Sequence, residues 1–154
     1  DLATGLRVVS DVMLDDIGGS MGPLYGTFFR QMFRVIRNKE RIDAEVFHDM
    51  LSRALESIKD IGSAKVGDKT LLDTLEPAVI AFETQRKAGK DFSTALTAMK
   101  VAAEKGKDST VDMVAKVGRS SRLGERSRGV LDAGATSCWL ILCAMADSII
   151  AMEQ

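Results

Sequence analysis

The stretch DAEVFHDMLSRALESIKDIG, residues 43–62, decides the fold class, because its apolar residues recur with the period of an α-helix. These residues form one stripe of Val46, Phe47, Met50, Leu51, Leu55 and Ile58. Asp43 is a typical helix N-cap, and Lys59 shortly before Gly62 is typical of a helix C-terminus. The stretch therefore predicts an amphipathic helix over residues 43–60 that buries one face.

Similar start and stop signals recur along the chain, whereas the alternating pattern of β-strands is nearly absent. Ser109 is a further candidate N-cap, and Gly89, Gly106 and Gly118 each follow closely after a lysine. We therefore expect an all-α protein, with antiparallel neighbouring helices near residues 2–15, 23–38, 43–60, 69–87, 92–105, 109–117 and 133–152. Pro77 should kink the fourth of these helices.

Composition and charge limit the classes of partner. The chain has 154 residues, 45% hydrophobic and 28% charged, which suits one compact globular domain over residues 1–154. Its formal net charge of −1 gives no field that would attract nucleic acid or an anionic membrane surface. We therefore expect no direct contact with nucleic acid and no membrane association.

The most apolar segment, residues 138–152, is interrupted by Asp147 and Ser148 and falls short of the roughly 18–20 apolar residues that span a bilayer. Charged residues break the first apolar stretch, so no signal peptide is expected. The two cysteines, Cys138 and Cys143, would lie on different faces of one helix, which opposes a disulfide between them. These features favour a reducing, cytoplasmic location.

Three glycine-rich connections, each leading into a helix, are the candidate ligand sites. They are IGGSMGPLYGTFF (17–29), GSAKVGDKTLLDTLEP (62–77) and GRSSRLGERSRGVLDAGATSC (118–138). Glycines let the backbone approach a ligand closely, and the N-terminus of the following helix offers N–H groups to an anion. Taken alone, each connection is better explained as a tight helix–helix turn or a solvated loop than as a ligand site.

Other polar residues give weaker signals. His48, the only histidine, lacks the context of a catalytic triad and is expected at the surface or at the edge of the core. Asp68 and Asp73 flank a predicted helix start, where carboxylates favour the helix dipole. Three carboxylates near the end of the first helix could share a cation or be solvated: Asp11, Asp15 and Asp16. Four arginines of the third connection could meet phosphate, although a solvated basic loop explains most of them: Arg119, Arg122, Arg126 and Arg128.

Taken together, GGSMGPLYGTFF, GDKTLLDTLEP and GRSSRLGERSRGVLDAGATS, in this order and separation, resemble the nucleotide-binding L subunit of bacterial dihydroxyacetone kinase, the DhaL family. The same module forms the C-terminal domain of ATP-dependent dihydroxyacetone kinases. The resemblance runs over residues 1–154, and the third motif is its most specific part. It implies a barrel of antiparallel helices with the nucleotide at one rim, and a phosphotransferase with glycerone kinase activity.

The resemblance also implies a reaction and partners. In the phosphotransferase-system (phosphoenolpyruvate-dependent) members, ADP stays bound and receives phosphate from a phosphohistidine on the M subunit. The phosphate then passes to dihydroxyacetone, or a similar small ketose, on the K subunit. Two alternatives remain open: an ATP-dependent kinase domain of the same family, which would use ATP, or a metal-free adaptor that binds a transcriptional regulator.

Site residues are carried over by matching motif positions. The first loop places four residues beside the phosphates: Gly18, Gly19, Ser20 and Met21. The second loop lines the adenine pocket with Gly62 and Leu71. In the third loop Arg119 contacts the nucleotide, and a tripeptide starts the last helix: Asp132, Ala133 and Gly134. The chain departs from the family at three positions, with Met21 in place of a common serine, Ala133 in place of proline, and Val130 in place of a frequent histidine.

A metal site is the largest departure. The family holds two Mg²⁺ ions with three aspartates and a histidine in a segment that precedes the stretch matching Asp1. Nothing in this sequence replaces that cluster, since Asp11, Asp15 and Asp16 align elsewhere. We expect the sequence to be a fragment that lacks the first two helices of the barrel, rather than a degenerate paralogue, and to expose an apolar groove as a result.

Overall fold

The computed structural model describes residues 1–154 and contains helices and connections but no strand, which confirms the all-α class. The elements are α1 (Leu2–Asp15), α2 (Met21–Ile36), α3 (Ala44–Ile61), α4 (Leu72–Lys87), α5 (Phe92–Ser109), the 3₁₀ helices η1 (Thr110–Asp112) and η2 (Arg119–Ser127), and α6 (Ala133–Glu153). They fall into two compact units, Asp1–Ser63 and Ala64–Gln154.

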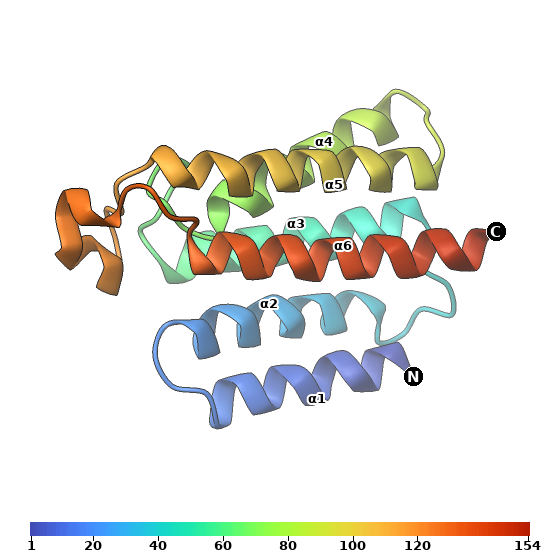
Figure 1. The fold of residues 1–154 in the computed structure, drawn as a ribbon. Coiled ribbons are helices and arrows are strands. Elements are labelled where there is room, and N and C mark those ends of the chain that lie inside the picture. The colour runs from blue at the N-terminus through green and yellow to red at the C-terminus, as the bar shows by residue number, and fades with distance from the viewer. The chain divides into compact units, whose positions relative to one another are not determined.

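Within the first unit, α1 and α2 form an antiparallel hairpin, and α3 packs on α2 (Figure 1). The buried Ser10 hydroxyl of α1 donates a 2.7 Å hydrogen bond to the carbonyl of Gly26 in α2. A side chain at Gly26 would run into Leu14, so this glycine lets the two helices approach. Asp43 caps α3 by accepting from the Val46 N–H at 2.9 Å, as its sequence predicts.

Within the second unit, α4 and α5 pack side by side, and α6 contacts both (Figure 1). The buried residues of α4 and α5 include Leu72, Leu75, Phe82, Leu96 and Met99. One face of α6 is buried through Ala135, Cys138, Leu142 and Ala146. Both cysteines are free, in agreement with their predicted positions on different faces.

The close packing of α4 and α5 depends on a proline and a glycine. Pro77 lies inside α4, and because it has no N–H, the carbonyl of Asp73 four residues earlier has no partner within the helix. A Cβ atom on Gly106 of α5 would overlap this Asp73 carbonyl, and it would lie 3.1 Å from the Pro77 ring. Gly106 is therefore a packing residue inside α5 and not the C-cap that the sequence predicted.

The predicted helix over residues 109–117 is wrong. α5 continues to Ser109, whose hydroxyl donates to the Gly106 carbonyl instead of capping a new helix, and only the short η1 follows. The backbone is extended at Met113. The fully buried Thr110 hydroxyl accepts from the Asp132 N–H at 3.0 Å, and this tertiary contact fixes the segment against the start of α6.

Two other expectations from glycine and apolar spacing need correction. Gly89 adopts the left-handed φ of +75° expected after a helix, but Gly62 ends α3 in an extended conformation with φ −115°. The 21-residue α6 contains an 18-residue window with a mean hydropathy of 1.7, so it is long and apolar enough to cross a membrane by length and composition, contrary to the prediction from residues 138–152. The core helix of a soluble protein passes the same test, so the length and hydropathy of α6 are only weak evidence for a membrane span.

The α4–α5 contact predicts opposite effects for two glycine-to-alanine changes. Gly106→Ala should lower the free energy of unfolding by about 2 kcal/mol, because the new methyl group collides with the Asp73 backbone. Gly5→Ala in α1 is the matched control. No atom lies within 4 Å of its Cβ position, so it should raise the free energy of unfolding by about 0.5–1 kcal/mol. Urea denaturation followed by circular dichroism measures both, and equal effects would contradict the packing role of Gly106.

Candidate functional site

The first glycine-rich connection has an open backbone and an uncapped helix start. Gly18 and Gly19 are exposed, no atom lies within 4 Å of their Cβ positions, and Gly19 has φ +75°. Ser20 precedes α2 without a side-chain capping bond, and Met21 is the first residue of the helix. The N-terminus of α2 therefore presents backbone N–H groups that no side chain of the loop satisfies.

Gly22 serves a different purpose from its neighbours. It is buried, and a Cβ atom there would overlap the carbonyl of Ile17 and lie 2.7 Å from the carbonyl of Met13. Its lack of a side chain lets α2 begin directly against the end of α1. Although Gly22 belongs to the same glycine-rich connection as Gly18 and Gly19, the structure assigns it to helix packing.

In the second unit, Asp73 organises the second glycine-rich connection. This carboxylate is only 2% exposed, and its two oxygens accept hydrogen bonds from the N–H groups of Gly67 at 2.7 Å and Thr70 at 2.8 Å. Gly67 has φ +100°, which turns its N–H toward the carboxylate. Asp73 thus fixes the backbone of residues 67–70 through two hydrogen bonds, in addition to the favourable contact with the helix dipole that its position predicted.

Lys69 joins the second connection to the third. Its ammonium is buried, with 4% of the residue exposed, and it donates hydrogen bonds to the carbonyls of Ser127 and Val130 at 2.6 Å and of Met113 at 3.3 Å. Lys69 is also the one non-glycine residue with a positive φ, +63°. Three donors meet three acceptors, so one side chain fixes backbone at both ends of residues 113–130.

The third connection is ordered by internal contacts as well. The buried Ser127 hydroxyl accepts from the Ala115 N–H at 2.9 Å and donates to the Gly124 carbonyl at 2.7 Å. Arg128 pairs with Glu125 and donates to the Asp112 carbonyl, and the hydrogen bond from Arg128 lowers the pKa of the Glu125 carboxyl. Arg119 is exposed at the start of η2 and has no acidic partner.

The start of α6 brings together the site residues predicted from two connections. Asp132 caps the helix by accepting from the Ala135 N–H at 2.8 Å, and Ala133 next to it is exposed. Gly134 lies against Leu71: a Cβ atom there would be 3.5 Å from both the Cβ and the N of Leu71. Leu71 is 3% exposed, so it forms the floor beneath the first turn of α6.

The electrostatics of this region centre on Asp132. Burial raises the pKa of its carboxyl, and the neighbouring Asp73 charge acts in the same direction. The hydrogen bond from Ala135 and the Lys69 ammonium lower the pKa of the same group but do not outweigh burial. The buried cation of Lys69 therefore partly offsets the effects of burial and of the Asp73 charge on Asp132.

Five of the ten predicted site residues lie in the second unit, and three of those, Asp132, Ala133 and Gly134, form the α6 start above Leu71. Arg119 is in the same unit, at the beginning of η2. The other five belong to the first unit: Gly18, Gly19, Ser20, Met21 and Gly62. Sequence reasoning missed Lys69, because a lysine between two polar residues in a loop is ordinarily solvated.

Asp68 is a second buried acid of the second connection. Its Oδ2 accepts from the Lys65 N–H at 3.0 Å, while its Oδ1 is buried without a hydrogen bond. The Lys65 ammonium lies 3.8 Å from Oδ1, within ion-pair distance but beyond a hydrogen bond, so the charge of Asp68 is compensated although its lone pairs are not.

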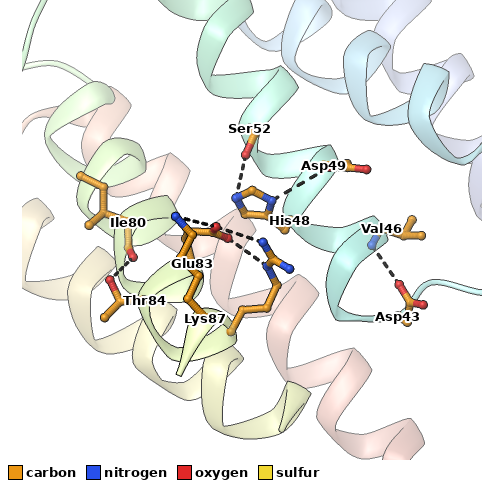
Figure 2. Close-up of polar contacts among 10 residues, drawn as sticks. Asp43, Val46, His48, Asp49, Ser52, Ile80, Glu83, Thr84 and Lys87 are labelled. Carbon is orange, nitrogen blue, oxygen red and sulfur yellow. Dashed lines mark hydrogen bonds and ion pairs between the residues drawn. The ribbon is translucent and has the colours of Figure 1, made fainter. Parts of the chain in front are cut away.

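The other polar candidates have structural partners. His48 lies within hydrogen-bond distance of Ser52 at 3.1 Å and 4.0 Å from Asp49 (Figure 2), which agrees with an edge-of-core position. Asp11 forms a 3.3 Å ion pair with Arg30. No group of three or more histidine, cysteine or acidic residues is placed to hold a metal ion. The residues present do not fit the two Mg²⁺ ions that the resemblance implies.

The contacts of Lys69 predict that its loss loosens residues 113–130. In Lys69→Met the aliphatic stem remains but the three carbonyl acceptors lose their donor, so unfolding free energy should fall by about 3 kcal/mol. Limited trypsin digestion should then cleave after Arg119, Arg122 or Arg126 much faster than in the unchanged protein. The exposed Lys116→Met is the matched control and should leave the digestion rate unchanged. Equal protection in Lys69→Met would show that the other loop contacts suffice.

The raised pKa of Asp132 predicts a pH-dependent effect of Asp132→Asn. Because the folded state favours the neutral carboxyl, the ionised form costs stability above its unfolded pKa, and this cost disappears as pH falls through the folded pKa. Asparagine caps helices as well as aspartate does. Asp132→Asn should therefore be more stable than the unchanged protein at pH 7, with a smaller difference at pH 4, in thermal unfolding measured at both values.

Comparison with known proteins identifies the family. The DAK2 domain model matches residues 1–147. The chain is 32% identical over 149 residues to the ADP-binding subunit DhaL of PEP-dependent dihydroxyacetone kinase 2 from Listeria innocua serovar 6a, covering 97% of this chain and 68% of the relative. It is 32% identical to the corresponding Escherichia coli K12 subunit, and the match covers 95% of this chain and 70% of that relative. It is 33% identical to L-erythrulose kinase of Pectobacterium atrosepticum, where the match covers 92% of this chain and 24% of the larger relative. The chain therefore belongs to the DAK2 domain family of dihydroxyacetone kinase subunits, which are phosphotransferases.

Proposed function

We propose that this chain is the nucleotide-binding part of a dihydroxyacetone kinase, in which bound ADP carries a phosphoryl group to a small ketose. The observation that carries the proposal is the contact of Gly134 with Leu71 at the Asp132-capped start of α6, because it joins two of the matched motifs in space. The names of three relatives at 32–36% identity describe them as ADP-binding subunits, which supports the same ligand here.

The charges of the structure suggest which end of the nucleotide each group of residues binds. The start of α6 carries the Asp132 carboxylate, and the Asp73 carboxylate of α4 acts on it from nearby, so the negative charge here would repel a diphosphate. We therefore assign the uncharged base to the surface formed by Gly134 over Leu71, with Ala133 beside it. Gly62 is assigned to the base by its matching motif position alone. The uncapped start of α2, with Gly18, Gly19, Ser20 and Met21, offers backbone N–H groups that suit phosphate oxygens. Arg119 has no acidic partner and suits the same charge.

The proposed reaction consists of two phosphoryl transfers. In the first, the P–N bond of a phosphohistidine breaks and a P–O bond forms to the terminal phosphate of ADP. In the second, that P–O bond breaks, a new one forms to a hydroxyl oxygen of the ketose, and the hydroxyl proton is released. Such transfers depend mainly on positioning and on compensation of phosphate charge. We assign these two roles to the residues of this chain, and no residue of it a covalent role.

The relatives also support the class of substrate and partner. Their names include kinases of dihydroxyacetone, L-erythrulose and D-erythrulose, which are all short-chain ketoses. We propose that a K subunit binds the ketose and that a phosphohistidine-carrying M subunit supplies the phosphate in the cytoplasm. An ATP-dependent kinase containing the same domain is the alternative, since the chain also matches about a quarter of the larger L-erythrulose kinase.

Nucleotide binding is tested by thermal unfolding with increasing ADP. At a concentration one hundred times the Kd, ADP should raise the free energy of unfolding by about 2.7 kcal/mol and the Tm accordingly. Phosphoryl transfer to dihydroxyacetone with phosphohistidine donor and with ATP then separates the two kinase types. Absence of any ADP-dependent shift would favour the adaptor that binds a regulator.

Arg119 is tested separately against another arginine of η2. Arg119→Ala should weaken ADP binding about tenfold, because one charge-assisted contact to phosphate is lost, and should leave helicity unchanged because the side chain is exposed. Arg122→Ala, an exposed neighbour without an acidic partner, is the control and should bind ADP normally. Calorimetric titration measures the affinities, and an equal loss in both variants would indicate a general charge effect instead of a specific contact.

A further inference from the structure

A cleft in the first unit, unrelated to the matched motifs, is lined by an unusual number of arginines. It lies between α1 and α2 and has a volume of about 220 Å³. Its charged lining consists of Arg7, Asp11, Arg30, Arg34 and Arg37. Four arginines against one aspartate leave three uncompensated positive charges in a chain whose formal net charge is −1.

The arginines converge because of their helical spacing. Arg30, Arg34 and Arg37 are separated by four and three residues, so they project from the same face of α2, and Arg7 faces them from α1. Asp11 holds Arg30 at 3.3 Å, whereas Arg7, Arg34 and Arg37 have no ion-pair partner. Such like charges repel one another, and a bound anion would remove this cost.

The helix dipole explains only part of this arrangement. Arg34 lies in the last turn of α2 and Arg37 follows it, where cations are favourable. Arg7 lies in the first half of α1, where a cation gains nothing from the dipole. Helix stability alone therefore does not explain why all four arginine side chains line the same cleft.

The lining fits a small phosphorylated molecule. Guanidinium groups bind phosphate oxygens in pairs, which gives both charge and direction. Phe33 contributes an aromatic wall, and Ser10 lies at the buried floor with its hydroxyl already bonded to Gly26. The volume is below the roughly 300–1,000 Å³ of pockets that hold drug-sized ligands, which favours a small ligand over a nucleotide.

The cleft is also separate from the first glycine-rich connection. Arg30 comes nine residues after Met21 in α2, which is roughly 13 Å along the helix axis, and Arg37 lies farther still. The α1–α2 connection closes the opposite end of the hairpin (Figure 1). We propose that the α1–α2 cleft is a second anion site that binds a small organic phosphate through Arg7, Arg30, Arg34 and Arg37.

Calorimetric titration of the purified protein with sn-glycerol 3-phosphate at low ionic strength tests the proposal. We expect saturable binding that is tighter than that of inorganic phosphate, absent for glycerol, and weakened by added salt. Arg34→Gln should weaken the affinity about tenfold, and Arg7→Gln together with Arg34→Gln should abolish it. Arg53→Gln on α3, which removes an exposed arginine outside the cleft, should have no effect.

Several outcomes would overturn the proposal. They are no saturable binding, equal binding of inorganic phosphate, no effect of Arg34→Gln, or binding of polyglutamate in place of the phosphate compound. The titration is repeated with saturating ADP. Competition between the two ligands would place glycerol 3-phosphate in the nucleotide site and would contradict a separate anion site in the α1–α2 cleft. Unchanged binding in the presence of ADP supports a separate site. Failure of ADP itself to bind would count against the proposed function alone.

Discussion

The second unit depends on one buried cation. The Lys69 ammonium donates to the carbonyls of Met113, Ser127 and Val130, and its charge acts on the carboxyl of Asp132. A buried ammonium is tolerated only when its charge and its donors are satisfied. Through these three hydrogen bonds Lys69 fixes the third connection, and that connection leads directly to Asp132 at the start of α6.

This arrangement answers why so many glycines, arginines and acids occupy residues 118–138. An irregular stretch of this length is costly in conformational entropy unless specific contacts order it. Here Ser127, Arg128 and the backbone of Gly129 supply such contacts, the last by donating to the Val111 carbonyl at 2.7 Å. The remaining arginines stay exposed, and so the loop combines a fixed backbone with unpaired cations, a combination suited to anionic ligands.

Much of the fold was predictable from the sequence because apolar period and capping chemistry are local. The stripe of residues 43–60, the caps Asp43 and Asp132 and the bounds of most helices follow from neighbours a few positions apart. The errors share one physical cause. The Thr110 hydroxyl accepts a hydrogen bond from the Asp132 N–H just where the sequence predicted a new helix. Gly106 lies inside α5 against the Asp73 carbonyl, where the sequence predicted a helix end. In both places a contact between residues distant in sequence overrides the local signal.

The candidate site divides in the same way. Gly134, Leu71 and Asp132 could be chosen by motif, and the structure places them together. Lys69 could not be chosen, because a lysine's burial depends on acceptors that lie 44 to 61 residues away. The arginine cleft needed the hairpin geometry of α1 and α2, since Arg7 and Arg37 are far apart in the chain.

The two kinds of glycine in the first connection have a consequence for evolution. Gly22 has no room for a side chain because the backbone of α1 occupies the space, whereas Gly18 and Gly19 face open solvent. Selection on Gly22 should thus persist in any descendant that keeps this hairpin, even one that has lost its ligand. If Gly18 serves the proposed nucleotide, selection on it should relax as soon as that ligand is lost. Substitution rates at these neighbouring positions would then distinguish working family members from inactive ones without any assay.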